Sequence, residues 1–406
     1  MTPWLSVLGV GEDGTEGLAP AARALLDSAE VLVGGARHLA MVKNGKAERL
    51  AWASPLARTI EEIAARRGKR VTVLATGDPM LYGIGTTLTR RFPREEITII
   101  PAVGSVALVC ARLAWPEADV EVVTLHGRPL ELLNYHMLPG AKLVILSEDG
   151  STPAKVAAAL STAGFGESRI CVFEHLGGVN ERRIESAARG FTEIGIADLN
   201  TIAVACRASP GATIRPRVPG LPDSAFETDG QLTKREVRAA TLAALGPLPG
   251  ALLWDVGAGS GSIAIEWLRT ERTSHAIAVE RDPARVARIA RNAAVLGVPR
   301  LEVVTGEAPA ALDGLATPDA VFVGGGVSNE KLLERCFSAL RPGGRFVANA
   351  VTVEGESALA QFHKRLGGEM TRLSVARLEP VGPSFSWRSL RTVTQLALTK
   401  AEGPEK

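Results

Sequence analysis

The chain has 406 residues, of which 46% are apolar and 22% are charged. This length exceeds that of a usual single domain, so the sequence predicts two or three domains with sizeable cores. The formal net charge of +2 and the lack of long blocks of like charge argue against nucleic acid as a partner. The amino terminus, residues 1–4, does not begin a secretion signal, and no apolar run approaches the roughly 20 residues that a membrane-spanning helix requires. We therefore expect a cytoplasmic protein without a membrane partner.

The cysteines and histidines form no recognisable metal site. No C-x-x-C pair is present, which argues against a zinc site and against a disulfide framework. The histidines show no ligand spacing. We expect no metal, and we expect the cysteines to be buried as small hydrophobic residues. The residues concerned are Cys110, Cys171, Cys206, Cys336, His136, His175, His275 and His363.

In the first half of the chain, short runs rich in β-branched residues alternate with helical stretches. The runs at 71–74, 97–100 and 143–146 predict strands, and the stretches between them are rich in Ala, Leu and Arg. This alternation is typical of an α/β sheet.

Residues 9–14 form a glycine-rich segment where a strand is expected to end, and such a place in an α/β sheet can bind a ligand. Two further segments, 75–83 and 100–105, follow along the chain, and a strand is expected at 201–205. In this order the segments resemble the tetrapyrrole methylase family over residues 1–206. The resemblance implies a two-lobed class III methyltransferase fold, with S-adenosylmethionine bound between the lobes.

The same resemblance implies two loops that contact the cofactor. The cofactor-binding residues it implies are Gly77, Asp78, Leu81, Gly104 and Ser105. Asp78 is also a candidate catalytic residue. Taken alone, the Gly-Asp-Pro sequence at 77–79 would equally favour an ordinary turn without a ligand.

Two further segments, 31–39 and 124–128, resemble the branch of this family that methylates a precorrin at carbon 5. A precorrin carries several acetate and propionate carboxylates, so a cleft that binds it needs cationic donors. We therefore take Arg37, His38, His126 and Arg128 as candidate substrate-binding residues. Each of them alone would more often be a surface or capping residue.

A linker is predicted at residues 207–219, where the periodic apolar pattern lapses and prolines alternate with glycines. The predicted domains are therefore 1–206 and 220–400. No internal repeat relates the two halves.

The second half alternates strands and helices more regularly. Successive buried parallel strands are expected at 252–256, 276–280, 301–304, 320–323 and 346–348. One helix between them is predicted to begin after Asp282, with Pro283 in its first turn, and to end at Gly297. Its expected apolar face consists of Val286, Ile289, Ala290, Ala293 and Leu296. The pattern predicts a Rossmann-like, doubly wound sheet.

A glycine loop at 257–261 follows the first of these strands and precedes an apolar helix. Such a loop lets the backbone approach a ligand at the carboxyl edge of the sheet. Ser262 replaces the last glycine of the dinucleotide fingerprint, which weakens a nicotinamide interpretation. Glu280 ends the next strand, where a carboxylate can accept both hydroxyls of a ribose. A ribose without a pyrophosphate fits S-adenosylmethionine better than NAD.

The second half resembles the class I methyltransferases over nearly its full length. The resemblance rests on residues 220–223, 232–238, 255–261, 306–309, 322–326 and 340–344. The cofactor-binding residues that it implies are Thr233, Asp255, Gly257, Ala258, Gly259, Ser260, Gly261, Glu280 and Ala308.

The resemblance also implies that Gly324 and Gly325 form a floor for the substrate. Asn349 ends a strand of the same sheet and is a candidate catalytic residue, although a turn role is equally compatible with its position. Glu307 is either an adenine contact or a solvated surface group, and we favour the second.

Together the halves resemble the fused precorrin methyltransferases of cobalamin biosynthesis. The resemblance implies that the first domain methylates carbon 5 of precorrin-6Y, and that the second methylates carbon 15 and removes carbon dioxide from the ring C acetate, giving precorrin-8. We expect one S-adenosylmethionine site per domain, a tetrapyrrole as the small-molecule substrate, and a homo-oligomer. Positioning of an activated methyl group supplies most of the catalysis, so no nucleophilic triad is required.

Three alternatives compete with this interpretation. A fused methyltransferase acting on RNA would require a basic stripe with stacking aromatic residues, yet aromatic residues make up only 4% of the chain. A dinucleotide-dependent oxidoreductase is disfavoured by Ser262. A degenerate half that serves only as a scaffold is disfavoured by the intact motifs of both halves.

Overall fold

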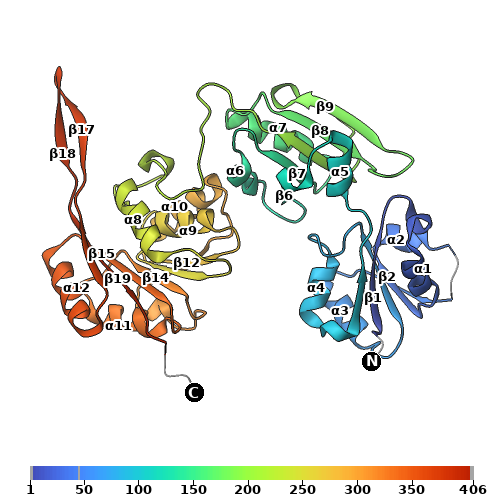
Figure 1. The fold of residues 1–406 in the computed structure, drawn as a ribbon, viewed down its shortest axis with the longest axis horizontal. Coiled ribbons are helices and arrows are strands. Elements are labelled where there is room, and N and C mark those ends of the chain that lie inside the picture. The colour runs from blue at the N-terminus through green and yellow to red at the C-terminus, as the bar shows by residue number, and fades with distance from the viewer. Residues whose placement is uncertain (1–2, 44–45, 403–406) are drawn as a thin grey trace. The chain divides into compact units, whose positions relative to one another are not determined.

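The computed structural model describes residues 3–43 and 46–402 (Figure 1). Of the amino-terminal segment 1–4, residues 1 and 2 lie outside the described part. The chain folds into two compact units, one of Met1–Leu130 with Met137–Thr213 and the other of Glu131–His136 with Ile214–Lys406. The segment Glu131–His136 had been expected in the first domain. It belongs to the second unit because the buried Tyr135 packs there, with its ring centroid 4.3 Å from the guanidinium carbon of Arg217.

The first unit begins with a sheet of five parallel strands in the order β3-β2-β4-β1-β5. Nearly all residues of β1 and β4 are buried, as expected for parallel strands that helices cover on both faces. The strands are β1 (Leu5–Val10), β2 (Val31–Gly34), β3 (Glu48–Ala51), β4 (Val71–Thr76) and β5 (Ile97–Ile100). The helices are α1 (Pro20–Asp27), α2 (Ala36–Met41), α3 (Leu56–Ala64), α4 (Ile84–Arg91) and α5 (Ser105–Leu113).

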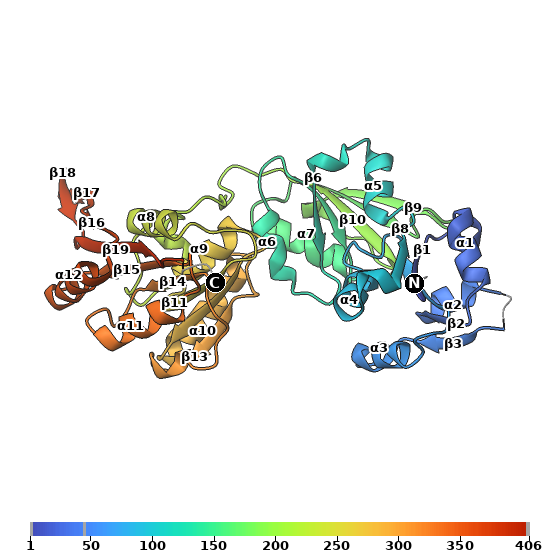
Figure 2. The ribbon, with the colours of Figure 1, turned by 60° about the horizontal axis from the view of Figure 1, so that its bottom comes forward.

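A second sheet, of mixed direction and in the order β6-β7-β10-β8-β9, forms the other lobe of this unit (Figure 2). Its strands are β6 (Val120–Thr124), β7 (Lys142–Leu146), β8 (Arg169–Glu174), β9 (Arg182–Ala187) and β10 (Asn200–Ala205). The helix α7 (Thr152–Thr162) belongs to this lobe, and α6 (Leu133–His136) to the second unit. The predicted strands of the first half are therefore confirmed, and so is the two-lobed fold.

The second unit has a seven-stranded sheet in the order β13-β12-β11-β14-β15-β19-β16, in which β19 is antiparallel to both its neighbours. Its strands are β11 (Leu252–Val256), β12 (His275–Glu280), β13 (Glu302–Thr305), β14 (Ala320–Val323), β15 (Arg345–Ala350), β16 (Glu369–Leu373) and β19 (Val393–Thr399). The five predicted strands are β11 to β15. Nothing in the sequence pattern predicted β16 or β19.

Helices cover both faces of this sheet, which confirms the doubly wound fold. One hydrophobic cluster joins the sheet to α8 (Arg235–Leu245), α9 (Ser262–Thr270) and α10 (Pro283–Val295). A second cluster joins the opposite face to α11 (Glu330–Ala339) and α12 (Val353–Leu366).

The helix α10 begins as predicted, because the Asp282 carboxylate accepts a hydrogen bond from the Ala284 N–H at 2.8 Å. The prediction of its apolar face was wrong at Ala290, which is exposed. Asn292 is buried instead, and its amide donates hydrogen bonds to the carbonyls of Glu227 and Ser260. These two contacts are tertiary and leave no trace in the helix's own periodicity.

A two-stranded hairpin, β17 (Ala376–Val381) and β18 (Ser384–Ser389), stands out from the second unit (Figure 1). Leu378 pairs with Trp387 and Pro380 with Phe385, so these four side chains share one face. All four are exposed. An isolated hairpin is marginally stable in water, and an exposed apolar face is uncommon without a partner.

The four cysteines are buried and form no disulfides, as predicted. Within residues 3–43 and 46–402, no helix is both long and apolar enough to span a lipid bilayer.

Candidate functional sites

The glycine loop after β11 is in backbone contact with the loop after β14. Gly257, Gly259 and Gly261 all have positive φ angles, of +73°, +60° and +76°. A Cβ atom on Gly257 would lie 2.8 Å from the Cα of Gly325. Only glycine fits this position without a shift of one backbone or the other. The predicted cofactor loop and the predicted substrate floor therefore meet at the carboxyl edge of the sheet.

Glu280, at the end of β12, is buried and fixed by backbone donors. Its Oε2 accepts the Gly259 N–H at 2.8 Å, and its Oε1 accepts the N–H groups of Arg281 and Asp282 at 3.0 and 3.1 Å. No cationic side chain of the described residues forms an ion pair with it. A carboxylate has about four acceptor positions, so Glu280 retains capacity for a ligand hydroxyl.

Asp255, the predicted start of the cofactor motif, lies beneath the loop and is fully buried. Its Oδ2 accepts the Ala264 N–H at 3.0 Å, while its Oδ1 is buried without a partner among the described residues. Burial raises the pKa of this carboxyl to about 7, against the opposing effect of the Ala264 hydrogen bond. Asp255 therefore supports the loop from below.

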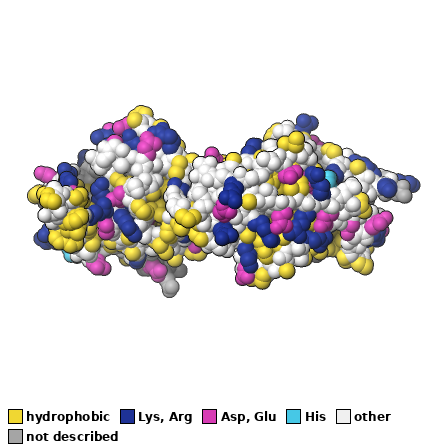
Figure 3. All heavy atoms as spheres, turned by 90° about the horizontal axis from the view of Figure 1, so that it is seen from above, with side chains coloured by type: hydrophobic (Ala, Val, Ile, Leu, Met, Phe, Trp, Pro, Cys, Tyr) yellow, Lys and Arg dark blue, Asp and Glu magenta, His cyan; other side chains and the backbone are white. Residues whose placement is uncertain are grey.

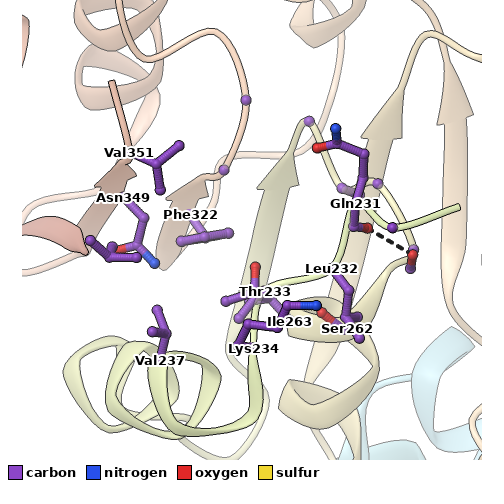
Figure 4. A pocket seen from close by; sticks show the side chains of 18 of the residues that line it. Gln231, Leu232, Thr233, Lys234, Val237, Ser262, Ile263, Phe322, Asn349 and Val351 are labelled. Atoms are coloured by element: carbon purple, nitrogen blue, oxygen red, sulfur yellow. Dashed lines mark hydrogen bonds between the residues drawn. The ribbon is translucent and has the colours of Figure 1, made fainter. Parts of the chain in front are cut away.

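The segment from Asp229 to Lys234 closes the other side of the loop. The Ser260 hydroxyl donates to the Gln231 carbonyl at 3.0 Å, as the dashed line in Figure 4 marks. Asp229 is held by Arg285 at 2.8 Å and by Arg288 at 3.1 Å.

These parts enclose a cavity of about 1000 Å³ in the second unit. Its first part, which we call the loop part, includes Gln231, Leu232, Thr233, the loop 257–260, Glu280 and Ala308. Its second part, the strand part, includes Val237, Phe322, Asn349, Val351 and Val393 (Figure 4). Every predicted residue of the second half except Asp255 and Gly261 lines this one cavity.

Glu307 also lines the cavity, but its side chain is 75% exposed and pairs with Arg281 at 3.4 Å. This geometry agrees with the expected surface role. Ala308, its neighbour, contributes to the core on one face of the sheet.

Asn349 is oriented by a polar network that the sequence did not indicate. Its Nδ2 donates to the Thr241 hydroxyl at 2.9 Å, and its Oδ1 accepts from the Gln395 amide at 2.9 Å. Gln395 also donates to Thr241 at 3.0 Å. Because Thr241 and Gln395 are buried, the network holds the Asn349 amide as a fixed part of the cavity wall.

A buried ion pair supports the start of this unit. Arg238 and Glu266 are both inaccessible to solvent and lie 2.7 Å apart, and Glu266 also accepts the N–H groups of Gly220 and Leu221. The sequence offered one sign of this ion pair, because Glu266 is the only acidic residue of the mostly apolar helix α9.

In the first unit, three loops at the carboxyl edge of the parallel sheet come into backbone contact. The Gly77 N–H donates to the Val10 carbonyl, and the Gly77 carbonyl accepts from the Ala102 N–H at 3.1 Å. A Cβ atom on Gly77 would lie 3.0 Å from the Cα of Gly104, which is the N-cap of α5 beginning at Ser105. The structure therefore brings the two predicted cofactor loops together.

Asp78 and Leu81 have structural partners in this loop. The Asp78 carboxylate accepts the Met80 N–H at 2.8 Å, which is the turn arrangement that its sequence also allowed. Leu81 packs against the hydrophobic core of the other lobe.

Arg37 and His38 lie in the first turn of α2, which follows β2, and they contact neighbouring side chains. Arg37 pairs with Glu12, and both Arg37 and His38 contact the Thr76 hydroxyl, at 3.3 and 3.2 Å. His175, from the other lobe, lies 3.3 Å from Glu12. Burial, with a smaller effect of Arg37, lowers the pKa of His38 to about 4, so its ring is neutral at pH 7. His38 can therefore offer a hydrogen bond to a substrate, but no charge.

The other two predicted cations lie apart from this group. His126 is 74% exposed, with its Nδ1 3.6 Å from Glu148. The Arg128 guanidinium lies 5.3 Å from the ring centroid of Tyr82, in the loop that follows Asp78. No contact between described residues joins these two side chains to Arg37 or His38.

The two units of the chain match two different families of known proteins. Residues 5–190 match the tetrapyrrole (corrin/porphyrin) methylases, and residues 224–400 match the precorrin methyltransferase domain. The precorrin-6Y C(5,15)-methyltransferase [decarboxylating] of a Sinorhizobium species is 48% identical over 403 residues, which are 98% of this chain and 97% of that protein. The chain belongs to this family of decarboxylating precorrin-6Y methyltransferases.

Further similarities concern the whole chain and the second unit. The precorrin-6Y C(5,15)-methyltransferase of Mycobacterium tuberculosis is 42% identical over 97% of this chain and 99% of its own length. The crystal structure of the C-terminal domain of the Rhodobacter capsulatus precorrin-6Y C5,15-methyltransferase is 45% identical, with a TM-score of 0.44, and covers 46% of this chain and 100% of that one. The predicted family and the prediction of an enzyme are confirmed, while the alternatives of an oxidoreductase and of a scaffold are not supported.

Proposed function

We propose that this chain methylates precorrin-6Y at carbons 5 and 15 with S-adenosylmethionine and removes carbon dioxide from the ring C acetate, giving precorrin-8. The observation that carries the proposal is the fixed Glu280 carboxylate beside the glycine loop, in a cavity whose other part is open to a second ligand. Family membership supports the choice of a precorrin as that ligand.

The residues of the second unit fit the cofactor. The loop 257–261 has the positive φ angles and the close backbone contacts that allow a ligand to approach without side chains in the way. Glu280 has acceptor capacity for a ribose diol, and Thr233 and Ala308 line the same part of the cavity. S-adenosylmethionine would supply a sulfonium-activated methyl group.

In this mechanism the chain's residues act mainly by positioning. Glu280 and the glycine loop would hold the donor at one end of the cavity, and Gly324 and Gly325 would bring the acceptor carbon into line with the methyl group. Asn349, fixed by Thr241 and Gln395, would hydrogen-bond the acceptor. Valines and Phe322 would surround the ring C acetate and keep out water. When the C–C bond to the carboxylate breaks, its electron pair would pass into the conjugated macrocycle, which would then take up a proton.

The first unit would carry the second site, with Gly77, Asp78, Leu81, Gly104 and Ser105 around the cofactor. The contact between the loops at Gly77 and Gly104 supports this. Arg37, His38, His126 and Arg128 would face the substrate. Three of them contact the segment 75–83 that holds the predicted cofactor loop: Arg37 and His38 contact the Thr76 hydroxyl, and Arg128 lies over the Tyr82 ring.

Calorimetric titration of the full-length chain with S-adenosylmethionine tests the two sites. The wild type should bind two equivalents. Glu280→Ala should lose one of them, or weaken it roughly 10- to 100-fold, since it removes a charged acceptor of ligand hydroxyls. Glu307→Ala is the matched control, because this carboxylate lines the same cavity but is exposed. Gly77→Ala should affect only the other equivalent.

Activity is tested with precorrin-6Y and S-adenosylmethionine carrying a labelled methyl group. Two new methyl signals and one released carbon dioxide per macrocycle are expected. An unlabelled macrocycle, with label appearing in a structured RNA instead, would refute the proposal.

We also propose a cytoplasmic homo-oligomer in which the hairpin faces of two copies cover each other. The four free, buried cysteines are compatible with a reducing compartment. Hydrophobic side chains gather at the end of the second unit that carries the hairpin (Figure 3). In sedimentation, Phe385→Ser with Trp387→Ser should give a smaller species, while Val179→Ser, at an exposed apolar residue in the first unit, should not.

A further inference from the structure

Six cationic side chains line the cavity in the second unit, and four of them are neutralised within the chain. Arg281 pairs with Glu307 at 3.4 Å, and Arg285 pairs with Asp229 at 2.8 Å. Arg377 pairs with Asp223 at 3.0 Å and with Glu236 at 2.7 Å, and Arg388 pairs with Glu379 at 3.1 Å. The six that line the cavity are Lys234, Arg281, Arg285, Arg377, Arg388 and Arg391.

Lys234 and Arg391 have no such partner. In the described part of the chain, neither side chain forms an ion pair or a hydrogen bond. Lys234 is half-buried immediately before α8, and Arg391 is exposed at the foot of the hairpin, just after β18. The positive end of the α8 dipole does not favour a lysine at this place, so helix stability does not explain it.

The cavity therefore holds charges of both signs that lack an ion-pair partner among the described residues. Glu280 is such a carboxylate, and Lys234 and Arg391 bring one ammonium and one guanidinium group. The apolar side chains of Val237, Phe322 and Val351 line the same cavity (Figure 4). An apolar ring with carboxylates around its edge matches this combination of apolar side chains and unpaired cations.

We propose that Lys234 and Arg391 form a carboxylate-binding subsite, which holds acetate or propionate groups at the edge of the macrocycle during the reaction of the second unit. This inference rests on the proposed function. Lys234 would supply a compact charge beside Thr233, and Arg391 a planar pair of donors at the cavity mouth. Because both groups reach solvent, their attraction to the substrate is screened by salt.

The test uses the full-length chain with Lys234→Met and Arg391→Met, and follows carbon dioxide release from precorrin-6Y. Each variant should raise KM for precorrin-6Y roughly five- to tenfold, more than it lowers kcat, and the double variant should multiply the two effects. The rise of KM with ionic strength should become shallower. Arg391→Lys should recover part of the loss. The controls are Lys364→Met in the last turn of α12 and Arg272→Met, which carry cations outside the cavity.

Two ligands could bring a carboxylate to this subsite: the macrocycle, and the cofactor through its methionine part. Calorimetry with S-adenosylmethionine alone distinguishes them. Unchanged cofactor affinity in both variants supports the subsite, and weakened cofactor binding in Lys234→Met would overturn the assignment of that residue. If the wild type methylates precorrin-6Y but both variants keep its KM, the subsite alone would be overturned. A wild type that leaves precorrin-6Y unmodified would instead overturn the proposed function.

Discussion

Glu266 of the second unit is buried together with its partner Arg238, whereas Glu174 of the first unit is buried beside Arg182, whose side chain is 53% exposed. The same contrast holds for the candidate sites. In the second unit, backbone N–H groups and buried carboxylates of a single sheet fix the site. In the first, partly exposed side chains such as Arg37 and His175 meet from two lobes. The second site is therefore expected to be rigid, and the first to depend on how its lobes close.

The largest effect is expected from the buried ion pair. Arg238→Met leaves the Glu266 charge buried without its cation, which should cost roughly 3–5 kcal/mol of unfolding free energy. Arg182→Met should cost about 1 kcal/mol or less, because its partner Glu174 keeps the Ala197 N–H and Arg182 faces solvent. Urea unfolding of the full-length chain measures both. Equal losses of unfolding free energy in the two variants would mean that the greater burial of Arg238 adds nothing to stability.

The second effect concerns pH. Burial raises the pKa of Asp255 to about 7, above its usual value of 3.8. Between these two values the folded chain keeps a proton that the unfolded chain has lost, so this group's contribution to stability is present below about pH 4 and falls as pH rises to about 7. The loss is at most about 4 kcal/mol.

Asp255→Asn should remove this dependence. The comparison is the difference in unfolding free energy between wild type and variant at about pH 5 and about pH 8, since other carboxylates titrate in both proteins. Asn retains an oxygen for the Ala264 N–H, so the variant should gain relative to the wild type at the higher pH. A constant difference across the range would contradict a raised pKa.

The third effect tests the backbone contact at the glycine loop. Gly257→Ala places a Cβ atom 2.8 Å from Gly325 at a φ of +73°, whereas Gly250→Ala has a φ of +74° and open space around it. Both variants share the backbone strain, but only the first displaces the loop. We expect carbon-15 methylation to fall roughly 100-fold in Gly257→Ala alone, because displacement of the loop would raise the activation barrier by about 3 kcal/mol. Similar activity in the two variants would mean that the contact is dispensable.

The same contrast explains what the sequence could predict. The strands β11 to β15 and Glu280 were predictable, because buried parallel strands are continuous apolar runs and the ligand edge of such a sheet is known from its topology. The contact of Gln395 with Asn349 was not predictable, because it forms only when β19, far along the chain, pairs with β15. The charge state of His38 was equally inaccessible, since it depends on burial beside Arg37.

The smallest effect is expected at Asp78, and it decides what that residue contributes to the first unit. Its carboxylate accepts the Met80 N–H, and an asparagine oxygen can accept the same bond. If Asp78 shapes the loop, Asp78→Asn should keep cofactor affinity at the first site within about twofold, while Asp78→Ala should lose roughly three- to tenfold. If instead Asn and Ala lose equally, the negative charge acts on the ligand. The first unit would then also bind through a carboxylate, as Glu280 is proposed to do in the second.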